Sequence, residues 1–175
     1  MENVKKNISA DMSGNILDIK DLAVSFDVYG LRSYVLDGIN FTVKKGQRVG
    51  LVGESGCGKT TTLKAILRVL AKNGRIDSGD IEFEGNSIYG MKADKLAHMR
   101  QTGVGMIFQD PSSALNPVFT IESQFLTALK YAYNKTKTKS ELQKIAIEAL
   151  ESVMLPDPER IMSSYPFQLS GGMRQ

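Results

Sequence analysis

The sequence predicts an α/β domain that gives way, at Gln109-Asp110-Pro111, to a mostly helical part. Two observations indicate the α/β part. Residues 48–52 form a short apolar run with β-branched side chains, typical of a strand covered on both faces in a parallel sheet, and a glycine-rich segment then leads into an amphipathic helix. The helical part is indicated by apolar residues that recur at helical spacing from Ile121 onward.

The strands of the first part are expected from alternation of apolar and polar side chains or from short apolar runs. Ile39, Phe41 and Val43 alternate with polar residues until Lys44-Lys45-Gly46 ends the strand. A turn at Glu84-Gly85-Asn86 indicates a small hairpin. Together these patterns predict strands at residues 16–26, 39–43, 48–52, 80–83, 87–89 and 104–108.

Helices are expected where apolar residues recur on one helical face, as they do at residues 59–70 and 121–133. A further helix is predicted to begin at Ser140, with Gln143 completing a capping box, and to end at Pro156 and Pro158. Its apolar face comprises Leu142, Ile145, Ala146, Ala149, Leu150 and Val153.

The composition excludes several classes of protein. The net charge of the 175 residues is only +3, without the clustered basic charge of a nucleic-acid-binding domain, so no nucleic-acid partner is expected. Cys57 is the single cysteine, which excludes an intrachain disulfide and a cysteine metal cluster. Residues 1–15 lack the apolar stretch of a secretory signal and are expected to form a flexible tail, and residues 134–139 to form a solvated loop.

Residues 53–60 read GESGCGKT and match G-x-x-x-x-G-K-[ST] between a predicted strand and a predicted helix, and they are called the phosphate loop below. Gly56 and Gly58 allow backbone conformations in which successive N–H groups face one concavity. Lys59 is expected to reach the β- and γ-phosphates of a nucleotide, and the Thr60 hydroxyl to bind Mg²⁺. The expected nucleotide contacts are Gly53, Glu54, Ser55, Gly56, Cys57, Gly58, Lys59, Thr60 and Thr61.

Cys57 could be mistaken for a nucleophile, but no base partner is visible in the sequence. The single histidine is His98, far along the chain. Cys57 is therefore interpreted as a small residue that fills the loop.

The chain closes on LSGGMRQ, and residues 106–117 read MIFQDPSSALNP. With the phosphate loop, these segments resemble the nucleotide-binding domain of ABC transporters over nearly the whole chain from about Ile16. The stretch YPFQLSGGMRQ is most similar to the ATPases of oligopeptide, dipeptide and nickel importers, which often carry histidine at the position of Phe167. The resemblance implies an α/β P-loop NTPase fold with an antiparallel β subdomain and an α-helical subdomain. The expected divisions are a tail at 1–15, a nucleotide-binding core at 16–109, a helical subdomain at 110–169 and the signature motif at 170–175.

The resemblance also assigns roles to individual residues. Gln109 corresponds to the glutamine that contacts Mg²⁺ or the attacking water and senses the membrane partner, and with Lys59 it is the expected catalytic residue. A capping role at a subdomain junction is the plainer interpretation of Gln109. Phe26 aligns with the aromatic residue that stacks on adenine, with Tyr29 and Tyr34 as alternatives. Phe26 is equally consistent with a core residue at the end of a strand.

Ser170, Gly171 and Gly172 are implied to bind the γ-phosphate of an ATP molecule held by another subunit, although Ser170 alone is also a good helix N-cap. By this resemblance the protein powers a peptide-type importer through ATP binding and hydrolysis, with Mg²⁺, between two head-to-tail subunits. The implied location is the cytoplasmic face of the cell membrane. Implied partners are transmembrane permease subunits, an identical or different second ATP-binding subunit and, indirectly, an external solute-binding protein.

The alternative function is that of a soluble, non-transport ABC ATPase of DNA repair or translation. It is disfavoured because the sequence has neither sustained heptads between Lys59 and Ser170 nor a second phosphate loop. In the family, an aspartate, a glutamate that acts as general base and a switch histidine follow the signature helix, and His98 is wrongly placed for the last role. We therefore expect a fragment without the C-terminal part of the core, able to bind nucleotide but inactive in hydrolysis, and marginally stable because residues 48–52 lose neighbouring strands.

Overall fold

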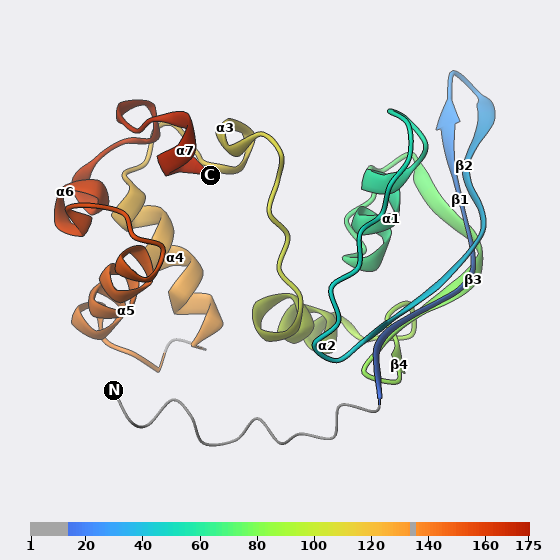
Figure 1. The fold of residues 1–175 in the computed structure, drawn as a ribbon, viewed down its shortest axis with the longest axis horizontal. Coiled ribbons are helices and arrows are strands. Elements are labelled where there is room, and N and C mark those ends of the chain that lie inside the picture. The colour runs from blue at the N-terminus through green and yellow to red at the C-terminus, as the bar shows by residue number, and fades with distance from the viewer. Residues whose placement is uncertain (1–13, 134–135) are drawn as a thin grey trace. The chain divides into compact units, whose positions relative to one another are not determined.

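The computed structural model describes residues 14–133 and 136–175, so nearly all of the tail predicted at residues 1–15 lies outside the described part. The chain divides between Ala97 and His98 into two compact units, and each is described on its own (Figure 1). The divisions expected from the sequence, at residues 109 and 169, stay predictions. Within the described residues, no helix has the length and apolar character needed to cross a membrane.

The first unit is built on a long hairpin of β1 (Asn15–Val28) and β2 (Leu31–Lys44). Strand β1 closely matches the predicted range 16–26, whereas β2 begins well before the predicted range 39–43. Tyr29 and Gly30 join them with φ angles of 51° and 79°. Positive φ at both central residues is typical of the two-residue turn whose twist matches that of the flanking strands. The hairpin is therefore set by its turn as well as by its apolar face.

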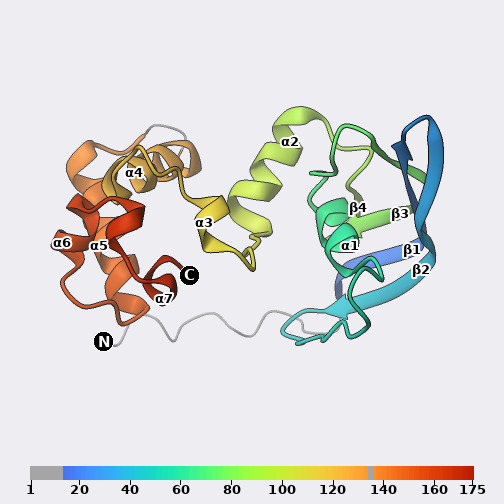
Figure 2. The same cartoon turned by 90° about the horizontal axis from the view of Figure 1, so that it is seen from above.

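The sheet is completed by β3 (Gly74–Phe83) and the short β4 (Asn86–Ser87), in the order β2-β1-β3-β4. All of its pairings are antiparallel. Helix α1 (Lys59–Ile66) lies against one face of this curved sheet, and α2 (Ala93–His98) follows β4 (Figure 1, Figure 2). The buried core of the unit includes Ile19, Leu22, Val24, Leu36, Ala65, Ile66, Ile81 and Ile88.

Two predicted strands are wrong. Residues 48–52 and 104–108 belong to no strand. The burial expected of residues 48–52 fails as well, since Val52 is 95% exposed, and Ile107 of the other run is 82% exposed. A parallel strand is stabilised by neighbours that come from distant parts of the sequence, and no segment of the described chain pairs with either run. Apolar composition alone does not order these segments.

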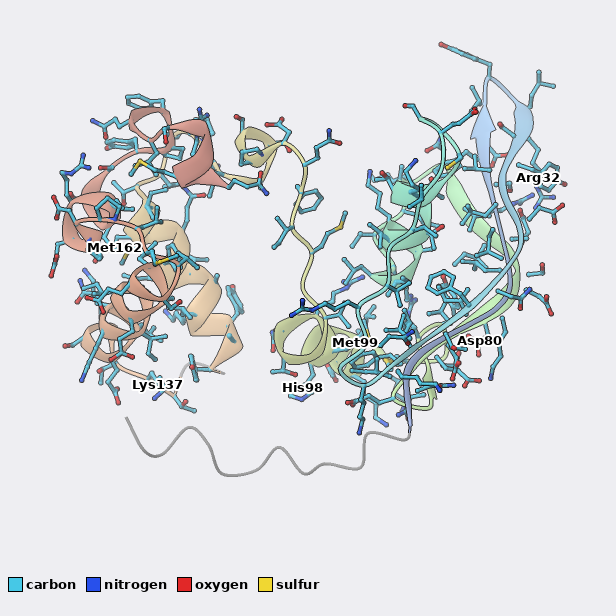
Figure 3. All side chains as sticks on the ribbon, in the orientation of Figure 1. Arg32, Asp80, His98, Met99, Lys137 and Met162 are labelled. Atoms are coloured by element: carbon cyan, nitrogen blue, oxygen red, sulfur yellow. The ribbon has the colours of Figure 1, made fainter. Side chains whose placement is uncertain are left out.

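The second unit is helical, as predicted. It contains the π-helical turn η1 (Met99–Gly103), helices α3 (Pro111–Ala114), α4 (Ile121–Ala132), α5 (Lys139–Ser152) and α6 (Pro158–Ser163), the 3₁₀ turn η2 (Pro166–Gln168) and α7 (Gly171–Arg174). Helices α4, α5 and α6 pack around a core that includes Met162, labelled in Figure 3. The buried residues of this core are Ile121, Ala146, Leu150, Ile161, Met162 and Leu169.

The start of α5 differs from the prediction. The N-cap is Thr138, and the capping box is completed by Glu141, whose carboxylate accepts from Thr138 N at 2.8 Å. Ser140 and Gln143 therefore lie inside the helix, and the predicted capping box is wrong. Gln143 instead donates to Glu122 Oε1 of α4 at 2.6 Å, which ties the two helices together.

Candidate functional site

The phosphate loop connects the exposed residues 48–52 to α1. Gly56 and Gly58 have φ angles of 84° and 94°, in agreement with the left-handed conformations expected of them. Gly58 is also the N-cap of α1, where a Cβ would lie 2.5 Å from Leu36 Cδ2 and 3.3 Å from the Val35 carbonyl oxygen. Both the backbone angle and the close approach to β2 therefore require glycine at this position.

The side chain of Lys59 folds back into the loop that precedes it. Its ammonium group donates to the carbonyl oxygens of Gly53 and Glu54 at 2.7 and 2.6 Å, and lies 3.5 Å from Cys57 Sγ. The loop thus encloses a positive charge whose partners are neutral carbonyls. A phosphate oxygen is a stronger, charge-assisted acceptor, so this cradle fits a nucleotide phosphate.

Cys57 fills space within the loop, in agreement with the interpretation from the sequence. The residue is exposed, but its sulfur packs on Gly53, where a Cβ would lie 2.6 Å from Sγ. The single histidine, His98, belongs to the second unit, where its Nε2 lies 3.4 Å from Thr102 Oγ1. Cys57 therefore shapes the loop around the lysine.

The first turn of α1 presents hydroxyl groups next to the loop. Thr60 is exposed and Thr61 half-buried, whereas Thr62 is buried and donates to Gly58 O at 3.1 Å. An exposed hydroxyl oxygen suits a hard cation such as Mg²⁺. The chemistry of Thr60 is thus compatible with the metal role expected from the sequence.

The three aromatic candidates for adenine stacking lie on the long hairpin and differ in how their rings are covered. Phe26 is half-buried, and its ring lies over Gly74 of β3, where a Cβ would be 2.5 Å from Cε1. Tyr34 is 64% exposed, with the guanidinium of Arg32, which Figure 3 labels, 5.2 Å from its ring centroid. Tyr29 is fully exposed at the turn. The assignment of Phe26 to adenine stays a prediction.

In the second unit, the signature motif is folded as a capped helical turn. Ser170 Oγ accepts from Met173 N at 3.3 Å, which confirms its N-cap geometry. A Cβ at Gly171 or Gly172 would meet no atom within 4 Å, so the start of α7 is open on that side. The glycines of this turn are therefore sterically accessible, as far as the described residues of the same unit are concerned.

Gln109 lies in the segment against which α7 packs. Gln109 is exposed and directly precedes Asp110, the N-cap of α3. Arg174 Nη1 of α7 donates to Ser112 Oγ at 3.0 Å, and Gln175 Nε2, just after α7, donates to Phe108 O at 3.1 Å. Sequence reasoning did not identify these contacts, because nothing in the local pattern links residues more than 60 positions apart.

Comparisons with known proteins cover both the phosphate loop and the signature motif. The sequence profile of the ABC transporter family matches residues 36–175. The chain is 38% identical, over 91% of its length, to the oligopeptide transport ATP-binding protein OppD of Bacillus subtilis, and 36% identical, over 91%, to the dipeptide transport ATP-binding protein DppD of Lactococcus lactis. These matches cover 44% and 46% of the two relatives, so the chain spans about half the length of the curated relatives it matches.

Among solved structures, the chain is similar to the ATP-binding cassette MJ0796, determined as a dimer in a post-hydrolysis state bound to ADP and Pi. The TM-score is 0.77 at 25% sequence identity, over 90% of this chain and 65% of that one. This similarity confirms the predicted P-loop fold with its β and helical parts. The residues matched by the family profile include the phosphate loop and the Ser170 turn, which lie in different units of the chain.

Proposed function

The chain belongs to the ABC transporter family, and from this we propose that it acts as the ATP-binding subunit of a peptide-type importer. The observation that carries the proposal is the Lys59 ammonium group enclosed by the phosphate loop, because that arrangement suits a triphosphate. The relatives are named as oligopeptide and dipeptide transport ATP-binding proteins, which favours an importer over an ATPase of DNA repair or translation.

In this proposal, each candidate site residue of the first unit has a defined role. Lys59 releases its two loop carbonyls and binds phosphate oxygens, while the N–H groups of the loop and the N-terminus of α1 add further donors. Phe26 stacks on adenine, and Thr60 holds Mg²⁺. When bound, Mg²⁺ offsets the charge of the phosphates and so favours attack by water.

The second unit supplies the remaining groups. Gln109 contacts Mg²⁺ or positions water, and Ser170, Gly171 and Gly172 bind the γ-phosphate of an ATP molecule held by a second, identical or different subunit. Pairing driven by ATP would act on transmembrane permease subunits at the cytoplasmic face of the membrane, with a solute-binding protein outside. The open glycine face of α7 supports this role, since a partner's nucleotide can approach it.

The decisive test of pairing uses an arginine at the signature turn. Ser170→Arg is expected to abolish ATP-dependent pairing, measured by sedimentation velocity with and without ATP and Mg²⁺, because the larger side chain occupies the approach to the glycines. ATP affinity measured by calorimetry should stay at the wild-type level, since Ser170 acts on the other subunit's nucleotide. Ser163→Arg is the matched control, as Ser163 is an exposed serine of α6 in the same unit.

Two outcomes would contradict the proposal. One is a wild-type chain that binds ATP and stays monomeric at every nucleotide concentration. The other is a Ser170→Arg variant that pairs as well as Ser163→Arg does.

A further inference from the structure

A pocket of about 500 Å³ lies in the second unit, on a part of the helical surface that the proposed function leaves without a role. It is formed by one face of α4, which contributes Leu126 and Lys130, and by the beginning of α5, which contributes Lys139 and Leu142. Its volume lies within the range of small-molecule sites, about 300–1,000 Å³.

The charged groups around the pocket are mostly positive. Lys130, Lys137 and Lys139 line it, against the single carboxylate of Glu122. That carboxylate is already engaged, because it accepts from Gln143 Nε2 at 2.6 Å and lies 3.7 Å from Lys139 Nζ. The pocket therefore carries the charge of Lys130 and Lys137 in excess.

Neither of these two lysines has an ion pair with a residue that the structure describes. Lys137, labelled in Figure 3, lies with its ammonium group 5.1 Å from the ring centroid of Tyr133. The acidic residue nearest to Lys137 along the chain is Glu141, whose carboxylate accepts from Thr138 N and Thr138 Oγ1 at 2.8 and 2.7 Å. Glu141 is thereby held in the capping box of α5 and is not part of the pocket lining, although its carboxylate also interacts electrostatically with Lys137.

Two helix N-termini add to the positive electrostatic potential of the pocket. The 12-residue α4 and the 14-residue α5 both begin at the pocket, next to their N-caps Thr120 and Thr138. Each N-terminus has a partial positive charge of about half an elementary charge. The hydroxyls of Thr120, Ser123 and Thr127 are further polar groups in the lining.

We propose that this pocket is a second anion site, specific for a ligand that bears a phosphate group. A phosphate has close to two negative charges and three strong acceptor oxygens, so it can satisfy Lys130 and Lys137 together, whereas a carboxylate has one charge. Leu126 and the buried Leu142 provide an apolar surface for the organic part of the ligand. The inference rests on the helical unit alone and is independent of the importer assignment.

The phosphate group can belong to a soluble molecule or to a lipid headgroup, and one set of variants distinguishes the two. Each variant is made in the full chain with Lys59→Ala, so that the phosphate loop does not bind the probe. Inorganic phosphate is titrated while ¹H–¹⁵N NMR follows the amides of α4 and α5. Sedimentation with phosphatidylglycerol vesicles, against phosphatidylcholine vesicles, tests the lipid source.

Lys130→Gln and Lys137→Gln should each weaken binding of the effective probe roughly tenfold, which corresponds to about 1.4 kcal/mol. Lys144→Gln removes the same charge from an exposed position of α5 outside the pocket lining, and it should have little effect. Glu122→Gln should strengthen binding, because it removes the negative charge nearest the ligand. Circular dichroism of each variant verifies that the helices remain folded.

Binding of inorganic phosphate that depends on Lys130 and Lys137 supports a soluble ligand, and vesicle binding with the same dependence supports a lipid headgroup. The proposal is overturned if neither probe binds. It is equally overturned if Lys144→Gln weakens binding as much as Lys130→Gln does.

Discussion

The phosphate loop and residues 48–52 adjoin each other in the sequence, yet only the loop folds as the sequence predicts. The loop is closed by contacts within a few positions, such as those of Lys59 with Gly53 and Glu54, and it docks on β2 through Gly58. Residues 48–52 remain exposed because a parallel strand depends on partners from elsewhere in the chain. A motif with local hydrogen bonds is thus specified by its own residues, whereas a buried strand is specified by its neighbours.

The contrast between a formed and an unformed strand is tested most strongly by two isoleucines. Ile81 of β3 is fully buried, whereas Ile107 lies 82% exposed in the other predicted strand that did not form. Ile81→Ala should lower the free energy of unfolding by about 2–5 kcal/mol through lost burial and a cavity. Ile107→Ala should change it by no more than about 0.5 kcal/mol. Urea denaturation of both variants measures the difference, and equal losses would show that residues 104–108 are buried in solution.

A smaller effect is expected at the glycine that docks the loop. Gly58→Ala forces a Cβ onto a residue with φ of 94° and against Leu36, which should cost about 1–3 kcal/mol. ATP affinity should fall as well, because the loop and the start of α1 move together. Gly50→Ala is the matched control, since Gly50 lacks a positive φ and its Cβ would meet no atom within 4 Å. Similar melting temperatures and ATP affinities in the two variants would contradict the proposed docking of the loop.

The prediction from sequence succeeded where the determining contacts are close along the chain. The loop glycines, the N-cap at Ser170 and the extent of α4 were all indicated by local patterns. The α5 boundary was missed because Thr138/Glu141 and Ser140/Gln143 both satisfy the capping pattern. Glu141 has the advantage, since a carboxylate in the first turn also interacts favourably with the helix dipole. This difference in charge is a signal in the sequence that could have ranked the two caps, whereas no local pattern reveals distant contacts such as that of Arg174 with Ser112.

The smallest effect concerns the packing of α1 against the rest of the first unit. Tyr89 donates to Ala65 O of α1 at 3.3 Å, and burial raises the pKa of its hydroxyl to about 12. In the unfolded chain a tyrosine ionises near pH 10, so from there to about pH 12 only the unfolded state loses this proton. Stability should therefore decline across this interval as pH rises. In thermal melts at several pH values, the melting temperature of Tyr89→Phe should fall less steeply with pH than that of the wild type. Identical slopes for the two proteins would place the Tyr89 hydroxyl in solvent.

The central claim, that the phosphate loop holds a nucleotide through Lys59, is tested most directly by calorimetric titration of ATP with Mg²⁺. Lys59→Ala removes the enclosed ammonium group, whereas Lys64→Ala removes the same charge five residues further along α1. We expect Lys59→Ala to bind ATP at least about 100-fold more weakly than the wild type, equivalent to about 2.7 kcal/mol, and Lys64→Ala to bind nearly as tightly as the wild type. Comparable ATP affinity in Lys59→Ala and wild type would contradict the account.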